Sequence, residues 1–389
     1  METKRFCSIF SQLLQLFPRL EFEQAVKETN AERHARGFRC WDQFVAMMFC
    51  QLGQANSLRE ICGGLASCLG KLVHLGAQEP KKSTLAYANE HRPWQLYETV
   101  FYQLLDKCRG LGGAKTKFRF KNPLMSIDGT CIELCTKLYP WAEYQRKKGA
   151  VKLHFLLDHA GYLPALMVLT TLKISELRVA RRWKFDPGTI VTFDRGYVDF
   201  EWFGQLNKAN VYFVTRLKRK ARYELLEQRS AAVERGILSD HVVRFTAPRT
   251  QRRYADKLRI VTIRTDEGEV LEFLTNNLVL AASTIAAIYK DRWQIELFFK
   301  ALKQNLRIKT FIGTSANALH IQIWTALIAM LILKYLKMKA QFGWSLSNLA
   351  ALLRLNLFVY RNLWAWLNEP FTPPPLNEET ELQGLLNFG

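Results

Sequence analysis

The segment from Tyr289 to Lys303 reads YKDRWQIELFFKALK and brings acidic, basic and phenolic side chains together at helical spacing. It holds no glycine or proline, which predicts one continuous helix. At about 100° per residue, four polar side chains lie within roughly 60° of one another: Tyr289, Arg292, Glu296 and Lys303. A carboxylate between cations suits a metal ion bound beside a phosphate. The alternative is a solvent-exposed face with ordinary i, i+4 ion pairs.

Two aspartates lie in or at the end of predicted strands. Asp128 lies in Leu124–Leu134, which alternates in polarity, and Asp194 ends the β-rich run from Thr189. One such aspartate is usually a turn or cap residue, because a buried lone carboxylate is unstable. With Glu296, the pair forms a set of hard oxygen ligands that favours Mg²⁺, or Mn²⁺ as a substitute, over zinc. Two such ions about 4 Å apart support in-line phosphoryl transfer.

Other titratable side chains compete with these three for the same role. They are Glu133, His154, Asp158, His159 and Asp199. We expect the carboxylates among them to be turn, rim or solvated residues. For the two histidines, a structural role is the default and a metal ligand is the alternative.

The elements that would position the carboxylates follow a recognisable order. From Arg119 the pattern predicts three strands, a helix, a strand, a helix and a strand. This is the order of a ribonuclease-H-like α/β sheet, in which the first and fourth strands are neighbours. Asp128 and Asp194 would therefore meet. The predicted fold class is α/β, with a ribonuclease-H-like core, a β-rich insertion and an all-helical N-terminal domain.

The helical, strand-like and basic patterns of the sequence divide the chain into five predicted parts. Residues 1–118 read as a helical N-terminal DNA-binding domain and 119–215 as the first part of the catalytic core. Residues 216–278 read as a basic, strand-rich insertion. Residues 279–345 complete the core, and 346–389 form a C-terminal helix and a tail.

The charge of the chain predicts a polyanionic partner, with nucleic acid first and an anionic membrane surface a distant alternative. Lys and Arg number 55 against 35 Asp and Glu, a net charge of +20, and residues 216–264 hold 14 basic against 5 acidic residues. Candidate phosphate contacts in this insertion are Lys218, Arg219, Lys220, Arg222, Arg252 and Arg253. The alternative is a solvated basic arm without a ligand.

A second group of candidate DNA contacts lies in the helical front end. Ser83 and Thr84 are predicted to cap a helix, and Lys81 and Lys82 lie just ahead of it, where backbone N–H groups favour phosphate. A helical bundle with solvated lysines is the alternative.

The N-terminus has no signal-peptide pattern, and the eight cysteines include no C-x-x-C pair. We therefore expect a cytoplasmic protein with reduced, mostly buried thiols, and packing roles for Cys131 and Cys135. The apolar run Ile323–Leu333 spans only about 16 Å as a helix, so it predicts a core helix and not a membrane partner.

The sequence resembles the bacterial insertion-sequence DDE transposases of the IS-four family. Tyr289, Arg292, Glu296 and Lys303 fit the signature Y-x2-R-x3-E-x6-K of that family. The strand around Asp128 (SIDGT) and the turn at Asp194 (TFDRGY) are similar to its two aspartate motifs. The 101 residues between Asp194 and Glu296 suit its β-rich insertion, and residues 273–277 (FLTNN) resemble the segment that returns to the core.

The resemblance implies a catalytic triad of Asp128, Asp194 and Glu296 on two Mg²⁺ ions, without a small-molecule cofactor. It implies a dimer that binds transposon end repeats, cuts them, often through a DNA hairpin, and joins the 3′-hydroxyls to target DNA, in the nucleoid. Tyr289, Arg292 and Lys303 would contact phosphates near the cut. No Trp lies between Phe203 and Leu280 to stack a flipped base.

Two alternatives remain open at this stage. One is a ribonuclease-H-like, structure-specific DNA nuclease, and the other is a DNA-binding protein that has lost catalysis. Strand joining on a 3′-hydroxyl substrate separates a transposase from both.

Overall fold

The structure is a computed structural model, and it describes residues 7–33, 35–68, 70–111, 117–135, 137–145, 148–218, 221–230, 236–308 and 310–372. It divides into two compact units. Residues 1–110 and 305–389 form the helical unit, and residues 111–304 form the sheet unit. The predicted separate N-terminal and C-terminal domains stay predictions, as do the other predicted boundaries.

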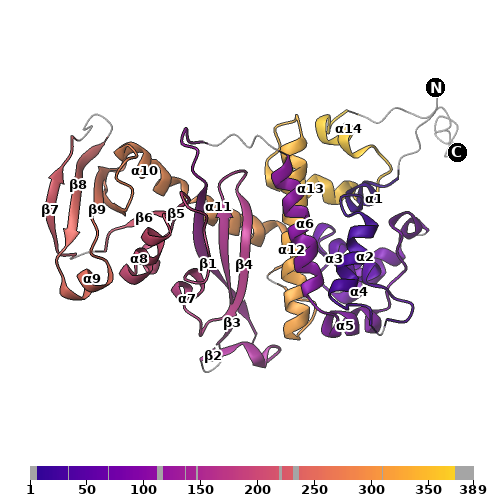
Figure 1. Ribbon diagram of the computed structural model, residues 1–389. Coiled ribbons are helices and arrows are strands. Elements are labelled where there is room, and N and C mark those ends of the chain that lie inside the picture. Colours follow the sequence, from indigo (N-terminus) through magenta and orange to yellow (C-terminus); the bar gives the residue numbers. More distant parts are fainter. Residues whose placement is uncertain are drawn as a thin grey trace. The chain divides into compact units, whose positions relative to one another are not determined.

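The sheet unit is built around five strands in the order β4–β3–β1–β5–β6. Their bounds are Leu124–Leu134 for β1, Lys148–Asp158 for β3, Leu163–Thr171 for β4, Ile190–Thr192 for β5 and Tyr212–Arg216 for β6. Strands β1, β5 and β6 are parallel, and β3 is antiparallel to both β1 and β4. The predicted pairing of the first and fourth strands is confirmed by the register Ser126 to Thr192. This mixed α/β arrangement fits a ribonuclease-H-like core (Figure 1).

The basic insertion continues the same sheet. Strand β10 (Val270–Thr275) pairs with β6, and the sheet goes on through β9 (Leu258–Arg264), β8 (Ile237–Phe245) and β7 (Tyr223–Gln228). All of these later pairs are antiparallel. The short strand β2 (Glu143–Gln145) pairs with β3 and brings the described sheet to ten strands. Strands β9 and β10 form a hairpin.

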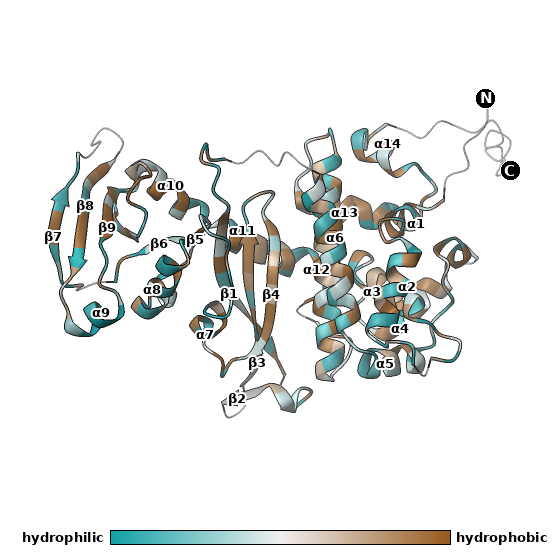
Figure 2. Cartoon of the chain, viewed as in Figure 1, coloured by the Kyte–Doolittle hydropathy of each residue, from teal (hydrophilic) through white to brown (hydrophobic). Residues whose placement is uncertain are grey.

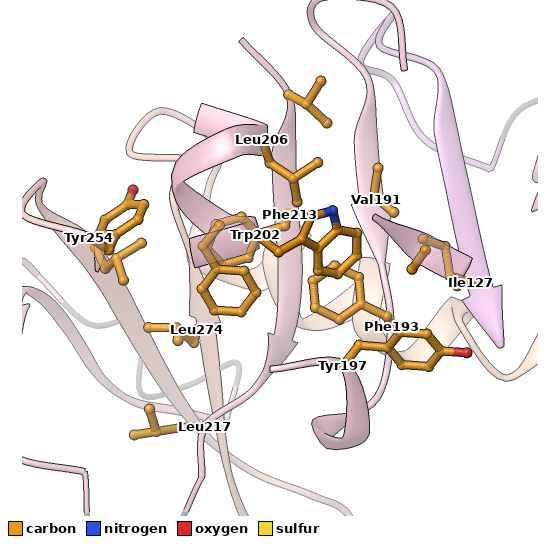
Figure 3. Packing of buried hydrophobic residues seen from close by; sticks show 14 of the residues in the cluster. Ile127, Val191, Phe193, Tyr197, Trp202, Leu206, Phe213, Leu217, Tyr254 and Leu274 are labelled. Atoms are coloured by element: carbon orange, nitrogen blue, oxygen red, sulfur yellow. The ribbon is translucent and has the colours of Figure 1, made fainter. Parts of the chain in front are cut away.

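Helices cover both faces of this sheet. Helices α7 (Glu176–Ala180) and α8 (Phe200–Lys208) pack on one face, where an aromatic cluster is built around Phe193, Trp202 and Phe213 (Figure 3). Helix α10 (Ala282–Asp291) packs on the other face through Ile285 and Ile288. Because side chains alternate along a strand, Ile127 joins the first cluster while Leu124 joins the second.

The remaining elements of the sheet unit are α11 (Gln294–Asn305), α9 (Pro248–Arg253) and two short 3₁₀ turns, Pro140–Ala142 and Arg195–Tyr197. Strand β4 is mostly hydrophobic, whereas α9 is hydrophilic (Figure 2). The arginines of α9 therefore lie on the surface of the insertion.

The helical unit holds nine described α-helices and one 3₁₀ turn, Lys71–Leu75. The helices are α1 (Ile9–Leu14), α2 (Arg19–Glu28), α3 (Cys40–Leu52), α4 (Leu58–Ala66), α5 (Lys82–His91), α6 (Gln95–Gly110), α12 (Ala316–Lys339), α13 (Leu346–Asn356) and α14 (Leu363–Asn368). Helix α12 packs against α3, α5, α6 and α13. The single C-terminal helix that we expected is two helices, because the chain turns between Leu357 and Asn362.

Helix α12 is the one described helix that is long and apolar enough to cross a membrane. In the most apolar part of α12, 83% of the residues are buried within the protein, as expected for a core helix. The expectation that most thiols are buried was wrong, because only Cys40, Cys50 and Cys108 are buried. Cys131 and Cys135 are exposed, so they have no packing role in this structure.

Candidate active site

Asp128 and Asp194 lie near one another because their strands, β1 and β5, are neighbours inside the sheet. Asp128 follows Ser126 by two residues and Asp194 follows Thr192 by two, so both side chains lie on the face that α10 covers. Each carboxylate accepts a backbone N–H at 2.8 Å, from Gly129 and Gly196 respectively. Asp194 thereby caps the 3₁₀ turn that starts at Arg195.

The environment of Asp128 favours its protonated form. Burial is the main cause, and the negative charges of Asp194 and Glu176 add to it, so that the pKa of Asp128 is raised from 3.8 to about 6. The N–H of Gly129 and the guanidinium of Arg292 oppose this rise. A carboxyl group held in this way has unbalanced negative charge around it at neutral pH, which a cation would relieve.

Arg292 joins the strand carboxylate to the helix carboxylate. Its Nη1 lies 3.6 Å from Oδ2 of Asp128, and its Nη2 donates to Oε1 of Glu296 at 2.8 Å. The side chain is 12% exposed, and its Nε has no hydrogen-bond partner among the described residues. Burial alone would lower the pKa of Arg292, but the neighbouring Tyr289 phenol and the carboxylates of Glu296 and Asp128 raise it. The guanidinium therefore stays charged between the two carboxylates.

The prediction of one continuous helix from Tyr289 to Lys303 was wrong. Helix α10 ends at Asp291, and α11 begins at Gln294. Between them the backbone makes tighter i→i−3 bonds, from Ile295 N to Arg292 O at 3.1 Å and from Glu296 N to Trp293 O at 3.0 Å. The two helices pack on different apolar surfaces, since α11 sets Phe298 and Phe299 against Phe155 of β3. The turn lets both helices reach their own surface.

Lys303 and Tyr289, the other two signature residues, also lie on this side of the sheet. The Nζ of Lys303 donates to Oγ1 of Thr130 at 2.6 Å and to the carbonyl of Cys131 at 3.3 Å. The ring of Tyr289 packs against Phe273, with centroids 4.8 Å apart, and lies 5.4 Å from the Arg292 guanidinium carbon. All four signature residues are thus placed on the Asp128 side of the sheet.

A chain of buried hydrogen bonds lies beside the turn between α10 and α11. His159 Nε2 is 2.5 Å from Oγ of Ser126, and its Nδ1 is 2.7 Å from Oδ2 of Asp291. Asp291 also accepts from Lys117 Nζ at 2.8 Å and from the Tyr162 hydroxyl at 3.3 Å. His159 is therefore a hydrogen-bonded structural histidine.

Sequence reasoning missed Glu176 and Tyr197 on the other face of β1. A side chain at Gly129 would place its Cβ 3.2 Å from Oε1 of Glu176, so the glycine permits the close approach of α7. The buried Tyr197 hydroxyl has no hydrogen-bond partner among the described residues and interacts with the charges of Glu176, Asp128 and Asp194. Glu176 follows the N-cap Ser175, where an acidic residue is common, so its pattern gave no signal.

The competing residues have structural explanations. Asp158 accepts from the N–H of Ala160 in the hairpin turn, and Asp199 caps α8 and pairs with Arg181 at 2.6 Å. Glu133 is exposed on β1. His154 contacts Thr170 at 2.8 Å, and burial lowers its pKa to about 4, so it is neutral at physiological pH.

The candidate DNA contacts are spread over both units. Lys218, Arg222, Arg252 and Arg253 are exposed, whereas Arg219 and Lys220 lie outside the described residues. Lys81 and Lys82 are exposed at the start of α5. The predicted cap was wrong, because Lys81 occupies the N-cap position and Ser83 and Thr84 lie in the first turn. The side chain of Lys81 makes no capping hydrogen bond.

The donor set fits a hard divalent cation by its chemistry, since Asp128, Asp194 and Glu296 supply only carboxylate oxygens. Within the described residues, however, no three His, Cys, Asp or Glu side chains converge closely enough to hold a metal ion. The Arg292 guanidinium lies between Asp128 and Glu296 instead.

The chain is similar in sequence to known families and proteins. Residues 119–332 match a family described as the transposase DDE domain, and residues 7–78 match a domain of unknown function, DUF4372. A protein of Sinorhizobium fredii named as transposase y4zB is 30% identical over 324 residues, which is 82% of this chain and 88% of that protein. A protein of Geobacillus stearothermophilus, named as a transposase for insertion sequence element IS5377, is 29% identical over 68% of this chain and 70% of its own length.

One solved structure, a cryo-EM structure of the piggyBac transposase synaptic complex with hairpin DNA, matches with a TM-score of 0.44 and 12% identity over 98% of this chain and 87% of that chain. The matched domain and the sequence relatives define the protein as a DNA transposase, an enzyme. The chain belongs to the transposase DDE domain family, as a bacterial insertion-sequence transposase.

Proposed function

We propose that this transposase cuts the ends of its insertion sequence and joins the 3′-hydroxyls to target DNA, with Asp128, Asp194 and Glu296 as the catalytic, metal-binding carboxylates. The observation that carries the proposal is the pair of contacts made by Arg292. They bring Glu296, which is 168 residues beyond Asp128 in the sequence, to the side of the sheet on which Asp128 lies. The parallel pairing of β5 with the first residues of β1 supports the place of Asp194.

Divalent metal ions are general cofactors of the DDE family, and two Mg²⁺ ions are the proposed form here. Bound ions would activate the attacking water or hydroxyl and stabilise the leaving oxygen. Asp128 and Asp194 would hold them from the strand side and Glu296 from the helix side. Tyr289 and Lys303 would contact the DNA backbone beside the cut.

Arg292 has a proposed exchange role in this scheme. In the described arrangement it is paired with carboxylates, and its Nε has no partner among the described residues. A DNA phosphate is a strong bidentate acceptor for guanidinium. DNA binding would therefore draw Arg292 away from Glu296 and free that carboxylate for the metal.

The narrower family and the binding partners of this transposase are also proposed here. We propose membership of the IS-four family, on the signature residues, and a dimer that holds two transposon ends in the nucleoid. The exposed arginines of the insertion and the lysines at the start of α5 would bind the DNA backbone.

The test uses the full chain, short duplexes that carry the terminal inverted repeats flanking its gene, and Mg²⁺. The variants Asp128→Asn, Asp194→Asn and Glu296→Gln are each expected to lower end cleavage by at least 1,000-fold, on the order seen when a whole catalytic group is lost. End binding in Ca²⁺ should stay within a few-fold of the wild type. Glu201→Gln, an exposed carboxylate on α8, serves as the control.

Joining of pre-cut ends to a plasmid distinguishes the two enzyme classes. Joined products support a transposase that completes the reaction, whereas cleavage without joining would identify a structure-specific nuclease. Full cleavage by any of the three variants would remove that residue from the proposed triad.

A further inference from the structure

We propose that Ser126, His159 and Asp291 act as positioning residues that set the turn between α10 and α11, and with it the places of Arg292 and Glu296. The inference rests on the proposed function, because Asp128 and Glu296 are the groups whose separation it controls. None of the three residues is one of the four signature positions, and Ser126 is the first residue of the SIDGT motif around Asp128.

The three side chains form one continuous chain of hydrogen bonds. The distances are 2.5 Å from Ser126 Oγ to His159 Nε2 and 2.7 Å from His159 Nδ1 to Asp291 Oδ2. In a neutral imidazole with its proton on Nδ1, the serine hydroxyl donates to Nε2 and Nδ1 donates to the carboxylate. In this arrangement both ring nitrogens of His159 have a hydrogen-bond partner.

The order Ser–His–Asp is also that of a hydrolytic triad, but burial excludes this use. Ser126 is fully buried and His159 is 8% exposed, so no substrate reaches the hydroxyl. Asp291 is 2% exposed. Buried polar groups with complete hydrogen bonding tend to fix a single arrangement of the elements that they join.

The elements joined are the ones that carry the proposed active site. Ser126 lies on β1, two residues before Asp128 and on the same face of the strand. His159 follows β3 in the hairpin turn. Asp291 is the last residue of α10, and Arg292 follows it directly in the turn that leads to Glu296. These hydrogen bonds therefore connect β1, which carries Asp128, to the start of the turn that leads to Glu296.

The charge at Asp291 strengthens this tie. Burial by itself would raise the pKa of Asp291, but the hydrogen bonds from His159 and Lys117 and the positive charge of Lys117 hold it below its ordinary value. Lys117 lies 2.8 Å from Oδ1, and Tyr162 lies 3.3 Å from Oδ2. An ionised Asp291 accepts from all of these donors, which anchors the last turn of α10 to the hairpin of β3 and β4.

The test compares two buried histidines of the same hairpin. His159→Ala breaks both bonds of the chain, whereas His154→Ala removes a side chain that contacts Thr170 and not Asp291. We expect His159→Ala to lower kcat for cleavage of the end duplex at least 10-fold, while the Kd for the duplex in Ca²⁺ changes less than 3-fold. His154→Ala should keep kcat within 3-fold. Equal losses of kcat in the two variants would overturn the proposal.

A conservative pair at Asp291 adds a graded readout. Asp291→Asn keeps an oxygen that accepts from His159, and Asp291→Ala keeps none. We expect kcat to fall in the order wild type, Asp291→Asn, Asp291→Ala, with Ser126→Ala reduced as well. An Asp291→Ala enzyme with wild-type kcat would contradict the proposed positioning role of Asp291.

Hydrogen exchange provides a readout that does not depend on activity. Amides of residues 288–297 should exchange at least 10-fold faster in His159→Ala than in the wild type or in His154→Ala, because the turn loses its anchor. Unchanged exchange would contradict the proposed tie. If instead Asp128→Asn cleaved normally while this exchange difference persisted, the proposed catalytic role would fail and the positioning of the turn would stand.

Discussion

At the scale of single residues, the burial of Asp128, a proposed catalytic carboxylate, lowers the stability of the folded protein at neutral pH. Its pKa is about 6 in the folded protein against 3.8 for an ordinary aspartate, mainly because it is buried. The folded state thus favours the protonated form. The resulting stabilisation is fully present below about pH 4 and is lost as the pH rises through 6.

The first prediction follows from this sign. Asp128→Asn, which cannot ionise, should make the protein more stable than the wild type at pH 8 in EDTA. A shift of about two pKa units corresponds to as much as about 3 kcal/mol in the free energy of unfolding. The gain should shrink towards pH 4. Urea unfolding at both pH values measures it, and a less stable variant at pH 8 would contradict the argument.

The second prediction concerns Glu176, whose charge raises the pKa of Asp128. Glu176→Gln should lower the pKa of Asp128 and move the acidic limb of the pH–cleavage profile to lower pH. Glutamine keeps an oxygen that can accept from Lys152, which now lies 3.1 Å from Oε1. Glu201→Gln is the matched control. An acidic limb that stays in place or moves to higher pH would show that Glu176 does not act on Asp128.

At the scale of elements, the strands were predictable and the turn in the signature helix was not. Alternation along residues 124–134 and the β-rich run that ends at Asp194 predicted the neighbouring strands, which are confirmed. The break after Asp291 left no local signal, because it depends on bonds to His159 and Lys117, which lie more than 130 residues away in sequence. Glu176 was missed for the same reason. Its proximity to Gly129 arises only after α7 packs on the sheet.

A third prediction belongs to the junction between the core and the insertion. Asn276 follows β10, accepts from the N–H of Phe213 at 2.8 Å, and donates to the carbonyl of Val211 and to Asn207. Asn276→Ala removes all three bonds and leaves two backbone groups without partners. We expect a loss of about 2 to 3 kcal/mol in the free energy of unfolding.

Urea unfolding also measures this loss, and Asn348→Ala is the comparison, because Asn348 is an exposed residue of α13 whose cited hydrogen bond is made by its backbone N–H and survives the change. A loss no larger than that of the control would mean that Asn276 does not hold the junction.

At the scale of the whole molecule, the excess of basic residues should govern DNA affinity. The exposed arginines of α9 are Arg249, Arg252 and Arg253. Changing all three to Gln should reduce the slope of log Kd against log salt by about 2 to 3, since each lost phosphate contact contributes roughly 0.9. Fluorescence anisotropy on the end duplex gives the slope.

Removal of two cations elsewhere provides the comparison for this fourth prediction. Lys337 and Lys339 are exposed at the end of α12, and their change to Gln should alter the slope by less than one. Equal effects per charge at both places would indicate a general charge effect, and α9 would then lose its assigned contact with DNA.

The pairing of β10 with β6 also predicts how proteins made from shortened insertion-sequence genes would behave. In this chain the insertion is the continuation of the sheet, and it shields the long side of β6 with backbone hydrogen bonds. Internal deletion of the insertion would leave those N–H and C=O groups open to other chains. Truncated derivatives of the gene are therefore expected to yield insoluble protein, and not a smaller, working recombinase.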